Sequence, residues 1–309
     1  MHTGYLNNIH PFTKIILSFL VAIILFFIVS FVGATIPMLV FDVSMEKLMG
    51  SLQDFSDQEN IAFLKYFQIL QTLGLFIIPA ILLALLFFKQ GLKQFGFQEK
   101  TTITTLGWVV VIMLFGLPVI NVFAELNSGM KLPSSLSSLE TILKNMEESA
   151  AQLTNAFLST NTLSGLLVNL LMIAVLPAIG EELFFRGLIQ RFFINWTKIP
   201  WMGIVLGAFL FSFMHLQFYG FIPRMYMGII FGLIYYWTGS MWLPIFAHFI
   251  NNGTAVMIYY FFGKEVAENK FDTLGTQEGN WYFFVFSLVF VFVALWQIAK
   301  EKKPEIINI

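Results

Sequence analysis

The 309-residue chain contains no cysteine and has few charged residues. The absence of cysteine excludes disulfides, thiolate nucleophiles and cysteine metal sites. Charged residues make up 11% of the sequence, whereas soluble domains carry about a quarter. The net charge is −1, and no cluster of basic residues resembles a nucleic-acid-binding patch. We therefore expect no nucleic-acid partner.

Hydrophobic residues dominate the composition. They account for 58% of the chain, and 37 residues are phenylalanine. Several apolar runs reach the roughly 20 residues that a helix needs to cross a bilayer. The first run, residues 15–40, is too long for a signal-peptide core, and the segment before it lacks a basic n-region, so we expect a retained helix. The sequence predicts an integral membrane protein, in contact with lipid and placed in a bacterial inner membrane because no organelle-targeting signal is present.

The fold class predicted from hydropathy is an all-α, polytopic transmembrane helical bundle. About eight spans are expected, at residues 15–40, 63–88, 104–122, 163–195, 200–218, 223–238, 241–262 and 281–299. Lysine and arginine near the span ends number ten on the side of the N-terminus and seven on the other side. This bias favours a topology with the N-terminus and the C-terminus both inside.

The alternation of apolar and polar stretches divides the chain into four regions. They are an N-terminal three-helix membrane region (1–122), a polar extracytoplasmic loop with a weak amphipathic period (123–162), a helical core (163–262), and a hairpin loop, last span and cytoplasmic tail (263–309). No internal repeat is present, and no pattern predicts an oligomeric state.

Three charged residues interrupt the fourth apolar run, in the sequence GEELFFRG. Charged side chains at the centre of a membrane helix cost at least about 2.5–3.5 kcal/mol, so they usually face a cavity and have partners. Glu182 and Arg186 are four residues apart and can form an ion pair on one helix face. Glu181 is rotated about 100° from Glu182, which leaves the two carboxylates free for separate tasks. The plainer alternative, a span end with snorkelling arginines, accounts poorly for two adjacent glutamates.

Two histidines lie in later hydrophobic segments, at His215 and His248. Together with a carboxylate pair they supply acid, base and metal-ligand capacity. Asn252 follows His248 by four residues, so it lies on the same helix face and can offer an amide to whatever His248 holds. Two histidines and a carboxylate are compatible with an open Zn²⁺ site, with water as the fourth ligand. The sequence has no HExxH motif, however, and the same residues can activate water without a metal. No organic cofactor is expected.

These residues resemble a known family of proteases. EELFFR (181–186), FSFMH (211–215) and HFINN (248–252) are similar to the EExxxR, FxxxH and HxxxN motifs of the CPBP, or Abi, intramembrane metalloproteases, which include the type II CAAX prenyl proteases. The resemblance covers about residues 160–260, and it makes the helical core a CPBP-like catalytic core. The first three spans, the polar loop and the last span match no part of the family pattern.

The resemblance implies a site inside the membrane with assigned roles. Glu181 would be the general base that activates water, with Glu182 and Arg186 as its supporting pair. His215 and His248 would position that water, directly or as metal ligands, and Asn252 would help to stabilise the oxyanion. The implied activity is that of a CAAX prenyl endopeptidase-like enzyme. It would hydrolyse a peptide bond of a membrane-associated, lipidated or prenylated protein or peptide.

Two other classes of function compete with the protease. Intramembrane Glu, His and Arg also build proton relays, so a proton-coupled transporter is one alternative. The absence of a repeated half argues against it. The second alternative is a non-catalytic immunity or scaffold protein that binds a peptide or partner through the same cavity.

Overall fold

Helices and their connections form the whole of the described structure. The computed structural model describes residues 4–40, 42–51 and 57–300, and no β-strand occurs within these ranges. The predicted all-α class is therefore confirmed. The predicted cytoplasmic tail lies outside the described residues.

The helical elements follow one another along the chain, with η marking 3₁₀- or π-helical segments. The first third contains α1 (Pro11–Val40), α2 (Met45–Ser51), α3 (Gln58–Thr72), η1 (Leu73–Ile77), α4 (Ile78–Phe87), η2 (Gly91–Phe95), α5 (Ile103–Phe115) and α6 (Leu117–Ser128). The middle contains η3 (Ser134–Leu136), α7 (Ser137–Leu158), α8 (Leu163–Asn169), η4 (Leu170–Val175), α9 (Leu176–Phe184), η5 (Phe185–Gln190) and α10 (Arg191–Thr197). The last part contains α11 (Pro200–Phe213), η6 (Phe218–Gly220), α12 (Phe221–Thr238), α13 (Trp242–Val266), η7 (Ala267–Phe271) and α14 (Tyr282–Ala299).

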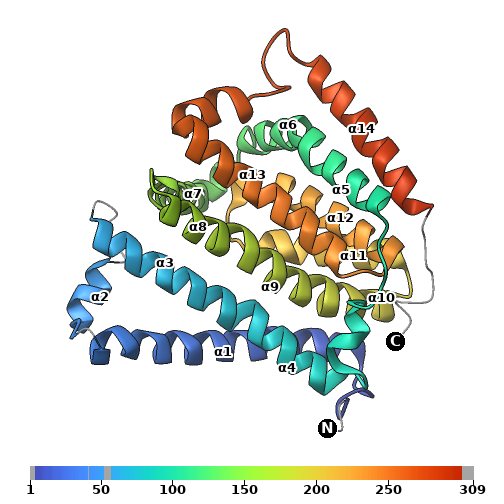
Figure 1. Cartoon of the computed structure of the whole chain (residues 1–309), viewed down its shortest axis with the longest axis horizontal. Coiled ribbons are helices and arrows are strands. Elements are labelled where there is room, and N and C mark those ends of the chain that lie inside the picture. The colour runs from blue at the N-terminus through green and yellow to red at the C-terminus, as the bar shows by residue number, and fades with distance from the viewer. Residues whose placement is uncertain (1–3, 41, 52–56, 301–309) are drawn as a thin grey trace.

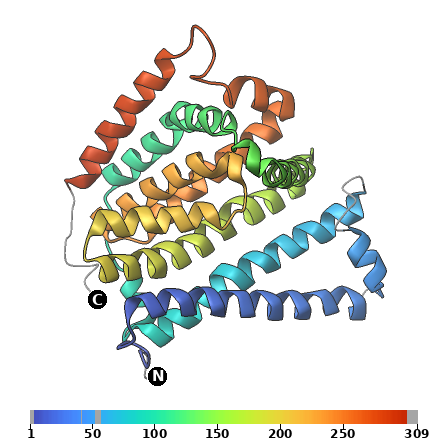
Figure 2. The same cartoon turned by 180° about the vertical axis from the view of Figure 1, so that it is seen from behind.

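The helices are arranged around a central group formed by α9, α11, α12 and α13 (Figure 1). On one side of this group α1 and α3–α4 lie next to each other, and on the other side α14 packs against α5 (Figure 2). Two apolar cores result. The larger joins α1, α4, α9, η5 and α10, and the second joins α5, α12, α13 and α14. The central helices therefore lie between two packed layers.

Local sequence signals set several of the helix ends. Thr102 and Thr162 each accept a hydrogen bond from a backbone N–H of the first turn of the following helix, as N-cap residues do. Gly239 ends α12 in the left-handed conformation, with φ of 69°. Its carbonyl lies so close to Gly96 that a Cβ there would come within 1.8 Å of the oxygen. These glycines permit the tight contact between the α12–α13 turn and the η2 segment.

The apolar helices confirm a polytopic membrane protein. Within the described residues, five segments are long and apolar enough to cross a membrane: Pro11–Val40, Gln58–Phe87, Leu163–Thr197, Phe218–Thr238 and Tyr282–Ala299. The pair α5 and α6, bent by 41°, makes a sixth if it is one span. All eight predicted spans fall on helices, but α11 is shorter than a span and α13 is not among these segments. The count of eight and the orientation of the termini stay predictions.

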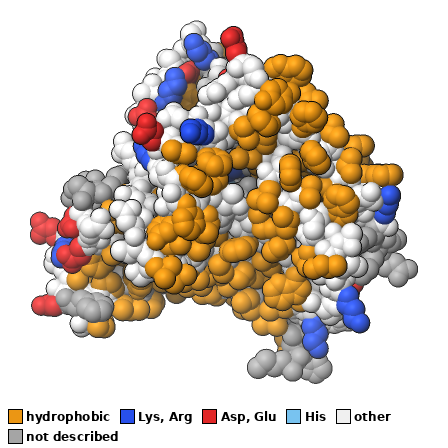
Figure 3. Space-filling model, turned by 45° about the horizontal axis from the view of Figure 1, so that its top comes forward, with side chains coloured by type: hydrophobic (Ala, Val, Ile, Leu, Met, Phe, Trp, Pro, Cys, Tyr) orange, Lys and Arg blue, Asp and Glu red, His pale blue; other side chains and the backbone are white. Residues whose placement is uncertain are grey.

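The surface agrees with a lipid environment. Large apolar side chains are widely exposed on α1 and α14, for example Phe31 at 73% and Phe292 at 71%. On the face shown in Figure 3, hydrophobic side chains cover a broad central area, and charged side chains lie towards its edges. The protein is an integral membrane protein, because exposed apolar area of this extent requires an apolar surrounding.

The polar region 123–162 is more ordered than a loop. Residues Ser137–Leu158 form the 22-residue helix α7, which follows the weak amphipathic period in the sequence. Its C-terminal end packs by Phe157 into a small core with Ile61, Leu64 and Met172. The helix therefore lies against the bundle, and it contacts α3, α8, α13 and η6.

Candidate active site

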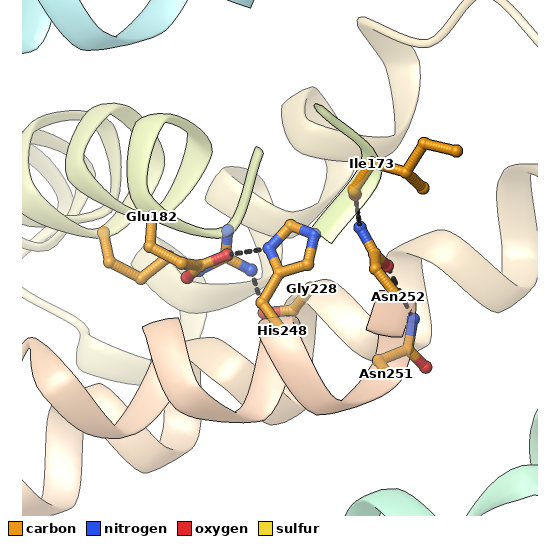
Figure 4. A network of polar contacts seen from close by, with 7 residues as sticks. Ile173, Glu182, Gly228, His248, Asn251 and Asn252 are labelled. Atoms are coloured by element: carbon orange, nitrogen blue, oxygen red, sulfur yellow. Dashed lines mark hydrogen bonds and ion pairs between the residues drawn. The ribbon is translucent and has the colours of Figure 1, made fainter. Parts of the chain in front are cut away.

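The apolar helix that carries the two candidate glutamates has an interrupted hydrogen-bond ladder. Proline has no N–H, so Pro177 cannot donate to the carbonyl four residues earlier, which is that of Ile173. The chain forms the π-helical segment η4 just before this proline. Asn252 on α13 donates from Nδ2 to the Ile173 carbonyl at 2.9 Å (Figure 4). The hydrogen bond from Asn252 therefore connects the helix that carries the two glutamates to α13.

Glu182 is the centre of a buried ion-pair network (Figure 4). Its Oε2 lies 2.9 Å from Arg186 Nε, one helical turn along the same helix, as the spacing predicts. Its Oε1 accepts a hydrogen bond of 2.8 Å from His248 Nδ1 on α13. Arg186 also donates from Nη2 to the Gly228 carbonyl of α12 at 3.0 Å. One carboxylate therefore connects three helices.

Aromatic rings enclose this network. The Arg186 guanidinium lies 4.8 Å from the centroid of Phe211 and 5.4 Å from that of Phe231. The His248 ring stacks on Phe231 with centroids 5.1 Å apart. Glu182 has no exposed surface and Arg186 has 2%. In such a dry setting a charge needs its partner, so the three side chains fix one another's positions.

Glu181 faces a different environment from Glu182. It lines a cavity of about 800 Å³ together with His215 and Asn252. Its charge interacts electrostatically with His248, Glu182 and Arg186. The side chains of the two adjacent glutamates therefore point to different surroundings, as expected from the 100° rotation between successive residues of a helix. Glu182 takes part in the ion pairs, and Glu181 is open to whatever enters the cavity.

Each of the two histidines forms a hydrogen bond through its Nδ1 atom. His248 Nδ1 contacts the Glu182 carboxylate, and His215 Nδ1 lies 2.9 Å from the Phe211 carbonyl. Carboxylate and carbonyl oxygens only accept, so each Nδ1 carries the proton and donates it. In the neutral form of the ring, each Nε2 is then an acceptor. Two such nitrogens can accept hydrogen bonds from a water molecule or bind a metal ion.

All six candidate residues lie within one segment that matches a known protein family. Residues 163–254 match a family described as type II CAAX prenyl endopeptidase Rce1-like. This segment is Rce1-like. The match confirms the family resemblance carried by the three motifs, over a stretch that begins at α8 and ends within α13.

One curated relative is similar to part of the chain. The chain is 30% identical over 82 residues to the uncharacterized protein YpbD of Bacillus subtilis (strain 168). The aligned part is 26% of this chain and 41% of that protein, so the chain covers less than half of the relative's length. No solved structure matches the chain.

Within the Rce1-like segment, His215 lies in a turn and not inside a helix. The predicted span 200–218 continued past it, but α11 ends at Phe213. The turn is held from outside the Rce1-like segment by Asn127 of α6. This buried side chain donates to the Phe218 carbonyl at 3.0 Å and accepts from the Ile222 N–H at 2.7 Å. The position of His215 thus depends on a helix that the family match does not include.

The two histidines predicted as zinc ligands, His215 and His248, both lie in the Rce1-like segment. Metal-binding histidines usually donate their other ring N–H to a carboxylate or a carbonyl, as both histidines do here. Within the described ranges, however, no three His, Cys, Asp or Glu side chains converge closely enough to hold a metal ion. His215 and His248 therefore do not form a complete zinc site with Glu181 in this arrangement. Zinc stays a prediction.

Arg224 was not among the predicted site residues. It lies in the first turn of α12, and its guanidinium donates to the backbone carbonyl and to the side-chain oxygen of Gln217. It interacts electrostatically with Glu181 and with His215. The sequence signal that could have identified Arg224 is its position inside the predicted span 223–238, because charged residues within spans usually mark a functional cavity.

Replacing Asn252 by alanine is expected to destabilise the protein as well as alter the site. The Ile173 carbonyl would lose its partner in an apolar region, which costs about 1–3 kcal/mol. Thermal unfolding in detergent should show a lower midpoint for Asn252→Ala. Adding Pro177→Ala restores an N–H within reach of Ile173, so the double variant should recover part of the loss. If Asn252→Ala unfolds at the wild-type temperature, the structural role of this bond is wrong.

Proposed function

We propose that this protein is an intramembrane endopeptidase that hydrolyses a peptide bond with water activated by Glu181. The observation that carries the proposal is the division of labour between the two glutamates. Glu182 fixes His248 through a buried hydrogen bond, and Glu181 opens into the cavity that His215 and Asn252 also line. The description of the Rce1-like family as a prenyl endopeptidase supports the same reaction type.

In the first step a water molecule in the cavity gives a proton to the Glu181 carboxylate. The other hydrogen of the water is donated to Nε2 of His215 or of His248, which orients the water oxygen toward the scissile carbonyl. The water oxygen forms a bond to the carbonyl carbon, and the carbonyl oxygen becomes an oxyanion. A general base in reach of its water contributes about 10²–10⁴-fold to the rate.

In the second step the oxyanion collapses and the C–N bond breaks. Glu181 returns the proton to the departing nitrogen, so the side chain ends the cycle as a carboxylate. Asn252 uses one amide hydrogen for Ile173, which leaves the other for the oxyanion. A single donor of this kind is worth about 10²–10³-fold in turnover. The products are a new carboxylate and a new amine.

The substrate and the surroundings belong to the same proposal. We propose a membrane-associated, lipidated or prenylated protein or peptide as substrate, because the cavity lies in a bundle with extensive apolar surface. A bacterial inner membrane is the proposed location. Zinc, held by His215 and His248, is the proposed optional cofactor. It would supply a Lewis acid beside the same water.

The test is cleavage of a peptide library by the purified protein in detergent, read by mass spectrometry. Wild-type protein should produce defined fragments. His248→Ala should lower cleavage by at least about 10²-fold, because a ring nitrogen that positions the water is removed. His10→Ala, far along the chain in the N-terminal segment, is the matched control and should cleave normally. Equal cleavage by wild type and His248→Ala would place the reaction elsewhere, and no cleavage of any peptide would favour a binding protein or a transporter.

The same assay decides on zinc. Protein dialysed against a chelator and analysed for metal should lose activity and regain it with added Zn²⁺ if the metal takes part. Full activity of demonstrably metal-free protein would contradict the zinc prediction and leave the side-chain mechanism in place.

A further inference from the structure

The cavity at Glu181 has two walls of different origin. One wall consists of residues of the Rce1-like segment, including Glu181, His215 and Asn252. The opposite wall comes from α3 and α7, which lie outside residues 163–254. Its members are Gln68, Gln71, Ile142, Asn145, Met146, Ser149, Ala150, Leu153, Thr154 and Phe157. We call these ten residues the α3–α7 wall. The family match therefore accounts for the reactive side of the cavity and not for this one.

The α3–α7 wall presents side-chain amides to the cavity. Gln68 and Gln71 are three residues apart, so they lie on one face of α3, inside the apolar segment Gln58–Phe87. Asn145 adds a third amide from α7. None of the three side chains forms a hydrogen bond with another described residue. Each amide keeps both donors and acceptors, which is what the N–H and C=O groups of a peptide main chain require.

The rest of the wall is uncharged and, apart from Ser149 and Thr154, apolar. Ile142 and Met146 remain 55% and 39% exposed, and with Leu153 and Phe157 they follow the apolar stripe of α7. The helix is fixed in place beside the cavity. The Tyr219 N–H donates to Glu147 at 3.2 Å, and Asn169 donates to the Phe157 carbonyl at 2.7 Å. The exposed stripe is therefore held as a rigid surface opposite Glu181.

The dimensions of the wall fit an extended peptide. Ile142 and Phe157 are 15 positions apart, so they are separated by about 22 Å of helix. An extended chain rises about 3.3 Å per residue, so six or seven peptide residues cover that length. A cavity of about 800 Å³ is within the usual range for ligand sites. A charged substrate side chain placed against the wall would lose water without gaining a partner.

We propose that the α3–α7 wall is the specificity surface for the substrate. Gln68, Gln71 and Asn145 bind the main chain of an extended peptide of six or seven residues, and the stripe on α7 accepts apolar, uncharged side chains. This inference rests on the proposed function, since it identifies the segment that Glu181 cleaves.

The main-chain part is tested with the double variant Gln68→Leu/Gln71→Leu, using the best cleaved peptide of the library. Its KM should rise about tenfold or more, the equivalent of one or two lost hydrogen bonds, with kcat nearly unchanged. A series of this peptide, each member N-methylated at one main-chain nitrogen, supplies a second readout. At least one methylation should raise KM in the wild type and have little further effect in the double variant. Gln152→Leu, the same change at an exposed position outside the wall, is the control and should leave KM unaltered.

The side-chain part is tested by Met146→Glu. This variant should cleave apolar peptides at least about tenfold less efficiently and should gain activity on peptides with a lysine at one position. Leu139→Glu, on an exposed position of α7 outside the wall, should do neither.

The outcomes separate the two proposals. If the wild type cleaves the library but both wall variants keep the wild-type KM and side-chain preference, the specificity surface is wrong and the protease stands. If the wild type cleaves nothing, labelled library peptides are tested for binding to the folded protein. Binding that is weakened by Gln68→Leu/Gln71→Leu supports the wall without the enzyme, and binding unaffected by it overturns the wall as well.

Discussion

Replacing Glu181 by glutamine is expected to lower kcat by about 10²–10⁴-fold while the protein stays folded. Glutamine has nearly the same shape as glutamate but cannot take a proton from water at neutral pH. Among the described residues, the ion pairs of the buried network belong to Glu182, whereas Glu181 lines an open cavity. The change should therefore remove the base and leave the architecture intact. KM should change little, because a carboxylate that acts on water contributes mainly to the transition state.

The measurement is steady-state cleavage of one fluorogenic peptide, with thermal unfolding as the folding check. Glu148→Gln is the matched control, since this glutamate is exposed on α7 and does not line the cavity. Turnover by Glu181→Gln within about threefold of the wild type would rule out a general-base role, whose contribution is much larger.

The largest expected effect on stability comes from Glu182→Leu. Arg186 would remain 2% exposed between Phe211 and Phe231 without its ion-pair partner. Removing one partner of a buried ion pair typically costs about 3–5 kcal/mol. His248 would also lose the acceptor for its Nδ1–H. We expect a strongly lowered unfolding midpoint in detergent together with loss of cleavage.

A second variant separates the effect of the unpaired charge on stability from the effect of Glu182 on activity. Glu182→Leu/Arg186→Met removes both charges, so much of the lost stability should return, because apolar replacements of a whole buried pair are often neutral. Activity should stay low, since His248 is still without its carboxylate partner. Cleavage restored together with stability would mean that the orientation of His248 by Glu182 is unnecessary.

The helices could be predicted from the sequence because each one is a long apolar run. All eight predicted spans lie on helices, but the number that cross the membrane could not be read from hydropathy alone. The chain bends by 41° between α5 and α6, where Pro118 lies in the first turn of the second helix, and α11 is too short for a span. Helix α7 was not predicted, because its sequence is polar and its amphipathic period is weak. The helix packs against α3 and η6, which the sequence alone does not indicate.

Within the candidate site, contacts between residues close together in the sequence could be predicted. The four-residue spacing of Glu182 and Arg186 predicts their ion pair, which the structure shows at 2.9 Å. The hydrogen bond between Glu182 and His248 joins residues 66 positions apart, so no spacing rule gives it. The same holds for the wall formed by α3 and α7. Its glutamines became informative only when the fold placed them opposite Glu181.

The role of Glu181 is tested most directly by a single turnover in H₂¹⁸O with the protein in excess over a peptide substrate. If Glu181 activates water, the new carboxylate of the product carries one ¹⁸O atom and the Glu181 side chain carries none, as mass spectrometry of both would show. If Glu181 instead attacks the peptide, the amine leaves and an anhydride forms; water that opens it at the Glu181 carbonyl leaves ¹⁸O in Glu181, and a Glu181 oxygen passes to the product. Label in that side chain, or product without label, would contradict water activation by Glu181.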